Sequence, residues 1–169
     1  MEQLELIFRR RSIRRYTAAM PDKHTIKLLL KAGMAAPSAN NIRPWHFYVL
    51  RNRERINALR EFHPHASMTA QSPLVVVICG DLQRQPHPGY IVQDCSAATQ
   101  NILLAATALG LGGVWLGLYP REARMEGISK LLNLPEHMMP VSMVALGFPD
   151  ENKPPHDEWY PAQVHEEGF

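Results

Sequence analysis

Apolar residues recur at the spacing of a helix face in four stretches of the chain. Residues 4–8 predict a short opening helix that ends at a run of arginines. A second amphipathic helix is predicted from Lys23, and it ends before Pro37 because the residue before a proline is disfavoured in the α region. Arg53–Phe62 and Glu122–Leu132 are predicted to be two further helices, the first with a strongly charged face.

Four other stretches have the composition of strands. Trp45–Leu50 is aromatic and β-branched. Residues 74–79 form a continuous apolar run bounded by Gly80 and Asp81, which is typical of a strand buried on both faces. Residues 114–118 and 141–146 predict two shorter strands.

The longest predicted helix covers residues 90–109, which are rich in alanine and apolar nearly all round. We expect it in the centre of the molecule or in a subunit interface. Gly110 follows it at a position that suits a left-handed cap. About four strands covered by helices predict an α+β fold, and the chain has no repeat or composition shift, so residues 1–169 are expected to form a single domain.

Composition excludes several classes of protein. With a net charge of +2, bulk attraction to nucleic acid or to an anionic membrane has little support. The longest apolar stretch, residues 91–112, contains Gln93 and Asp94 and is not typical of a membrane span, and the acidic N-terminus lacks the apolar core of a signal peptide. Cys79 and Cys95 are expected to be buried free thiols, which suits a reducing compartment and a cytoplasmic protein.

Basic residues are concentrated near the N-terminus. Three of the five residues in the stretch Arg10, Arg11, Ser12, Ile13 and Arg14 are arginines. Guanidinium groups present forked donors that match phosphate oxygens, and a serine hydroxyl can add another donor. The cluster is therefore a candidate phosphate site. On charge alone, a solvated basic turn is the alternative.

A second candidate site is the loop over residues 37–45. Its small and polar residues let a ligand approach the backbone and offer donors and acceptors to a polar heterocycle. An ordinary turn into a strand fits the same composition. The residues of interest are Pro37, Ser38, Ala39 and Asn41.

The glycine-rich stretch over residues 110–117 is not a dinucleotide fingerprint, because Trp115 stands where the third glycine belongs and the stretch follows a helix. Gly110 and Gly112 are expected in a tight helix-to-strand turn. Gly117 lies within a predicted strand, where glycine often marks close approach by a ligand. The eight histidines show no metal-ligand spacing, so we expect no metal site.

The order of these motifs resembles that of the nitroreductase family of FMN enzymes. The arginine cluster is followed by P-S-x-x-N-x-x-P-W entering a strand, and residues 93–101 and 110–112 continue the resemblance. It ends at residues 146–149 before a proline-rich tail and covers nearly the whole chain.

The resemblance implies a mainly antiparallel central sheet covered by helices, and a homodimer with FMN at the subunit interface. The helix over residues 90–109 would form the central dimer contact, and the tail, from about residue 150 to 169, would extend over the partner. The implied cofactor-binding residues are Arg10, Arg11, Ser12 and Arg14 at the phosphate, Pro37, Ser38, Ala39 and Asn41 at the ring from the other subunit, and Leu116 and Gly117 near N5.

Two positions depart from the family pattern. Arg43 stands where glutamine usually precedes the Pro-Trp pair, so a fixed positive charge is expected near the flavin or substrate mouth. The tail lacks the usual basic residue that closes over the phosphate. Either Lys153 or His156 could replace it, or the phosphate lacks that ligand.

The resemblance implies an FMN-dependent oxidoreductase that takes electrons from NADH or NADPH and passes them to nitroaromatic or quinone-like acceptors by a ping-pong mechanism. Because the flavin carries the chemistry, no side chain is expected to be catalytic. A flavin-dependent dehalogenase, a flavin-modifying enzyme and a non-catalytic flavin-binding protein are the alternatives.

Overall fold

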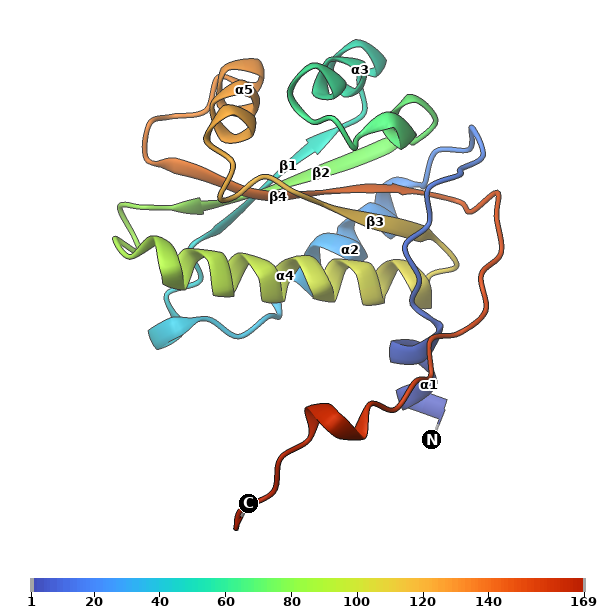
Figure 1. The fold of residues 1–169 in the computed structure, drawn as a ribbon. Coiled ribbons are helices and arrows are strands. Elements are labelled where there is room, and N and C mark those ends of the chain that lie inside the picture. The colour runs from blue at the N-terminus through green and yellow to red at the C-terminus, as the bar shows by residue number, and fades with distance from the viewer. Residues whose placement is uncertain (1, 169) are drawn as a thin grey trace.

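The computed structural model describes residues 2–168 and has helices on both sides of a four-stranded sheet (Figure 1). In chain order, the helices and strands are α1 (Glu2–Arg9), α2 (Lys23–Met34), β1 (Trp45–Leu50), α3 (Arg53–Phe62), β2 (Leu74–Asp81), α4 (Pro88–Ala108), β3 (Gly112–Gly117), α5 (Glu122–Leu132) and β4 (Met138–Gly147). Short 3-10 turns lie at Ala39–Asn41, Ser67–Ala70 and Pro161–Gln163. Among these helices, none combines the length and the apolar character that crossing a membrane requires.

The strands lie in the order β1-β2-β4-β3, and each neighbouring pair is antiparallel. The α+β fold with an antiparallel sheet is therefore confirmed. β2 and β4 occupy the centre and are buried along their whole length, as the continuous apolar run of β2 predicts. β1 and β3 form the two edges, so their outer backbone groups are available to other segments or to ligands.

Two apolar clusters fill the space on the two faces of the sheet. α2 and α4 cover one face, where Leu29, Ile78 and Ile102 are fully buried (Figure 1). α3 and α5 cover the other face, where Leu59, Ile128 and Met143 are fully buried. Because helices and apolar side chains cover both faces of the sheet, a ligand can reach the strands only at the edges and ends of the sheet.

The predicted elements are all present, with one error of assignment. Gly110 has a φ of 74° and ends α4 as expected. Gly112, which the sequence places in the turn, is instead the first residue of β3. A Cβ atom at Gly112 would lie 2.7 Å from atoms of Ile13, so glycine is required there because another segment packs against the strand.

The two ends of the chain extend away from the layered body (Figure 1). Residues 148–156 follow residues 8–17 in the opposite direction, through the backbone bonds Thr17 N–H to Phe148 O and His156 N–H to Phe8 O, both 2.9 Å long. Beyond them the tail exposes Trp159, which keeps 75% of its surface, and Tyr160. The outer side of α1 is also apolar, with Ile7 half exposed.

We predict that Gly112→Ala lowers the free energy of unfolding by about 1–3 kcal/mol, because the added methyl group overlaps Ile13. Gly117→Ala, at the other end of the same strand, is the matched control, since a Cβ atom there meets no atom within 4 Å. Urea unfolding of both variants measures the difference. Equal stability of the two variants would contradict the role given to Gly112.

Candidate functional site

Residues 10–16, called the arginine segment below, are attached to the free edge of β3. Ser12 forms an isolated parallel bridge with Gly113, and the Ile13 N–H donates to the Gly113 carbonyl at 3.0 Å. Ile13 is buried against Gly112. Because side chains alternate in direction along an extended segment, Ser12 and Arg14 face away from this contact.

Tyr16 fixes the end of the segment. Its buried hydroxyl lies within hydrogen-bond distance of the Ile13 carbonyl and, at 3.1 Å, of the Ala145 carbonyl on β4. Burial is the main cause that raises the pKa of Tyr16 above its ordinary value, so the phenol stays protonated and can donate. The segment is therefore held at Ser12, Ile13 and Tyr16, while the side chains of Arg10 and Arg14 are not part of the core.

The tail crosses the arginine segment and is tied to it by charged groups. Glu151 accepts the N–H groups of Arg14, at 2.5 Å, and of Arg15, at 3.3 Å. The Arg14 N–H is the main cause that lowers the pKa of Glu151. Lys153 Nζ lies 3.4 Å from Glu151 and donates to the Ser12 carbonyl at 2.6 Å. Of the two tail residues considered above, Lys153 lies at the cluster, whereas the His156 ring faces Glu158 at 3.9 Å.

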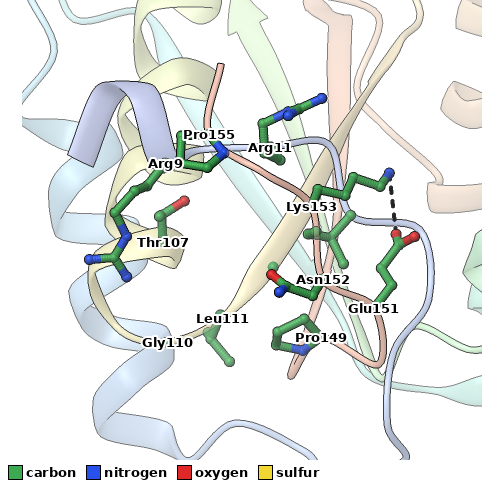
Figure 2. A pocket seen from close by; sticks show the side chains of 12 residues that line it. Arg9, Arg11, Thr107, Gly110, Leu111, Pro149, Glu151, Asn152, Lys153 and Pro155 are labelled. Carbon is green, nitrogen blue, oxygen red and sulfur yellow. Dashed lines mark ion pairs between the residues drawn. The ribbon is translucent and has the colours of Figure 1, made fainter. Parts of the chain in front are cut away.

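A cavity of about 400 Å³ lies between this crossing and the turn after α4 (Figure 2). Its lining includes Arg9, Arg11, Thr107, Leu111 and Lys153. Arg11 Nη1 donates to the Pro154 carbonyl, and in Figure 2 the side chains of Arg11 and Lys153 extend toward the same side. Two cations from distant parts of the sequence thus flank Ser12.

The far end of β3 offers an open strand edge. The Gly113 carbonyl accepts the Ile13 N–H, so the backbone groups of Gly113 point away from β4. Backbone groups alternate in direction along a strand, and those of Gly117, four residues later, therefore also point away from β4. No described atom lies within 4 Å of the position of a Cβ at Gly117. Leu116 is different, because its side chain is buried and its backbone groups face β4. Between Gly113 and Gly117 the strand rises by about 13 Å.

Two residues to which the sequence assigned no role in the site hold the Gly117 carbonyl. His63 Nε2 and Arg124 Nη1 each lie 3.0 Å from this oxygen. The His65 N–H donates to His63 Nδ1 at 3.3 Å, so Nε2 carries the proton of a neutral ring. Burial, followed by the charge of Arg124, lowers the pKa of His63.

The loop over residues 37–43 has an unusual backbone. Asn40, Asn41 and Arg43 have φ values of 52°, 56° and 54°, a region that side chains other than glycine seldom adopt. Such conformations cluster at ligand-binding sites. The Ser38 hydroxyl accepts the Arg43 N–H at 2.9 Å, and Arg43 Nε donates to Asn41 Oδ1 at 2.8 Å, so the Arg43 guanidinium is folded back on its own loop.

Asp94 on α4 anchors this loop. Its Oδ1 accepts the Ala39 N–H at 2.9 Å. The residue is 4% exposed, and Oδ2 has no hydrogen-bond partner within the described part of the chain. The contact joins residues 55 positions apart, so the sequence gives no signal that identifies Asp94 as the anchor of this loop.

The two candidate clusters lie at opposite corners of the sheet. The loop leads into β1 and the arginine segment lies on β3, which are the two edges (Figure 1). Three strand spacings separate them by about 14 Å across the sheet. They also lie at opposite ends, because Trp45 is in register with Gly80 and then Met139, whereas Gly113 is in register with Leu146. One chain therefore cannot bring both clusters to one small molecule.

Other chemistry has less support. Residues 2–168 contain no group of three or more histidine, cysteine, aspartate or glutamate side chains that could hold a metal ion. Cys79 and Cys95 are buried free thiols, as predicted. Burial raises the pKa of Cys95 to about 12, so this thiol is not a nucleophile.

Comparisons with known proteins agree with the motifs. The model of the nitroreductase family matches residues 7–73 and 63–148. A protein of Methanothermobacter thermautotrophicus, provisionally named NADH dehydrogenase/NAD(P)H nitroreductase, is 47% identical over 98% of this chain and 86% of its own length.

Solved structures extend the similarity to the fold. A structure from Parabacteroides distasonis with the same provisional name has a TM-score of 0.95 and 37% identity, covering 100% of this chain and 99% of its own. A Desulfovibrio desulfuricans protein, provisionally named a nitroreductase and solved in complex with FMN, has a TM-score of 0.84 and 30% identity, covering 98% and 96%.

The lowered pKa of His63 predicts a pH-dependent stability. An unfolded histidine has a pKa of about 6.5 and binds a proton that the folded ring resists, so the free energy of unfolding falls as the pH decreases below about 6.5. His63→Asn is expected to reduce this slope, and His24→Asn, at an exposed position of α2, to preserve it. Urea unfolding between about pH 7.5 and 5.5 tests this, and a slope unchanged in His63→Asn would contradict it.

Proposed function

The chain belongs to the nitroreductase family, and from this we propose that it is an FMN-dependent oxidoreductase that takes electrons from NADH or NADPH and passes them to nitroaromatic or quinone-like acceptors. The observation that carries the proposal is the pairing of the arginine segment with β3. It sets a cluster of hydroxyl and guanidinium groups, which suit a phosphate, at one end of a strand whose other end is an open edge. FMN matches this arrangement, because its phosphate and its ring are at the two ends of a ribityl chain.

The residues at the first end fit a phosphate. Ser12, Arg10 and Arg14 offer a hydroxyl and guanidinium groups, and the side chains of Arg11 and Lys153 add two cations next to Ser12. Charge-assisted hydrogen bonds of this kind are the strong ones. Lys153 therefore supplies a basic residue from the tail, although the surrounding sequence is acidic. Because the lack of such a residue was the feature that favoured a non-catalytic flavin-binding protein, this alternative loses support.

The residues at the second end fit a flat ring. The peptide between Leu116 and Gly117 presents an N–H at the open edge, and the space beside Gly117 admits a ring edge. Pro37, Ser38, Ala39 and Asn41 would cover the ring from a second copy, because the chain's own loop leads into β1, at the opposite edge of the sheet from β3.

Bound FMN would supply the electron-transfer chemistry between nicotinamide and acceptor, and the protein would supply orientation and electrostatics. The backbone at Gly117 orients the ring edge, and the arginine cluster holds the phosphate. No side chain is required as an acid or base. Donor and acceptor would occupy the same open edge in turn, which is a ping-pong scheme.

A homodimer is the assembly that completes this site. A two-fold axis would join the arginine cluster of one copy to the loop of the other, and would do so twice. The exposed apolar surface of α1 and the tail, including Ile7, Trp159 and Tyr160, supports the same conclusion. We propose that residues 1–169 form one domain whose tail, from about residue 150, lies over the partner, and that the protein works in the cytoplasm.

Arg10→Ala together with Arg14→Ala should weaken FMN binding by about 10- to 100-fold per arginine, since each charge-assisted bond contributes about 1.5–3 kcal/mol. The folded state should be unchanged, because neither guanidinium is part of the core. Fluorescence titration with FMN measures the affinity, and Arg55→Ala, an exposed arginine on α3, is the control. FMN affinity equal to that of the unaltered chain would show that the phosphate binds elsewhere.

Mixed dimers test which copy supplies which residues. A variant with Arg10→Ala and Arg14→Ala and a second variant with Ser38→Ala and Asn41→Ala should each bind FMN poorly. After unfolding and refolding together at equal amounts, about a quarter of the sites should be intact, because half of the dimers are mixed and each has one unaltered site. If the mixture binds no more FMN than the separate variants, the shared site is wrong.

A further inference from the structure

His63 and Arg124 converge on one backbone oxygen, and the proposed function gives neither of them a role. His63 follows α3 and Arg124 lies in the first turn of α5, two helices that pack together over the same face of the sheet. Each donates to the Gly117 carbonyl at 3.0 Å, and Arg124 Nη1 lies 3.2 Å from His63 Nε2. The two lone pairs of this carbonyl are thus both used by side chains from outside the strand, one of them a guanidinium.

The permanent charge of the pair belongs to Arg124. The His63 ring is 3% exposed and neutral, with its proton on Nε2. Arg124 is half-buried, so its charge is less screened than that of an arginine in free solvent. The pair thus places a fixed cation against the end of β3.

This cation borders the open edge where the ring is proposed to lie. In an extended strand the N–H and C=O groups of one residue point to the same side. Any ring edge that accepts the Gly117 N–H therefore lies next to the carbonyl that Arg124 and His63 hold. By alternation along β3, the free space beside Gly117 lies on the face that α4 covers, so His63 and Arg124 hold the Gly117 peptide from the opposite face.

We propose that Arg124 and His63 are positioning residues of the flavin site, which fix the Gly117 peptide against the ring and favour the reduced flavin over the oxidised flavin. This inference rests on the proposed function. A reduced flavin that has lost a proton is an anion whose negative charge is delocalised in the ring system, whereas the oxidised ring is neutral. A preorganised cation stabilises the charge that develops on reduction more than it stabilises the neutral ring.

The test separates charge from structure. In Arg124→Gln, which keeps an N–H donor, we expect affinity for oxidised FMN within about threefold of the unaltered chain, and affinity for reduced FMN at least tenfold lower. A tenfold change in this ratio lowers the two-electron midpoint potential by about 30 mV. Arg124→Lys should retain most of the potential. Arg121→Gln removes an exposed arginine three residues earlier and should leave it unchanged.

A second measurement needs no FMN. Because Arg124 lowers the pKa of His63, Arg124→Gln should raise that pKa in the FMN-free chain, as followed by NMR of the imidazole ring. A midpoint potential that is unchanged in Arg124→Gln, with FMN still bound, would overturn the inference alone. An unaltered chain that binds no FMN would overturn the proposed function and the inference with it.

Discussion

The pairing of the arginine segment with the free edge of β3 is the interaction on which the site depends. It joins residues about a hundred positions apart in the sequence through the bridge between Ser12 and Gly113, and Tyr16 secures it against β4. The sheet is buried on both faces, so an edge strand is where a ligand can reach backbone groups. Because the segment covers one end of β3, cationic side chains lie at that end, and the Gly117 N–H is exposed at the other end.

The tail completes this end through charges that look unfavourable in the sequence. Glu151 would weaken a phosphate site if its carboxylate faced the ligand, but it accepts the backbone N–H groups of Arg14 and Arg15. Its role is to hold the tail, and the tail then presents Lys153 to Ser12. Glu151 and Lys153, which also lie 3.4 Å from each other, therefore attach the tail to different backbone groups of the same segment.

Helices and strands could be predicted because the apolar periods of this chain are clear, and Trp45–Leu50, Arg53–Phe62 and Glu122–Leu132 have the observed bounds. Gly112 was misassigned because its requirement for glycine comes from Ile13, a contact between distant segments. His63, Arg124 and Asp94 were not found for the same reason. Each acts on the backbone of another element, and neither composition nor spacing indicates such a contact.

The central claim is that one flavin site combines the arginine segment of one copy with the loop of another. Hydrogen exchange measured by mass spectrometry, with and without FMN, tests it most directly. The account predicts that FMN slows exchange both in residues 10–14 and in residues 38–43, with the same dependence on FMN concentration. Protection of the arginine segment alone, with the loop over residues 38–43 unchanged, would contradict it.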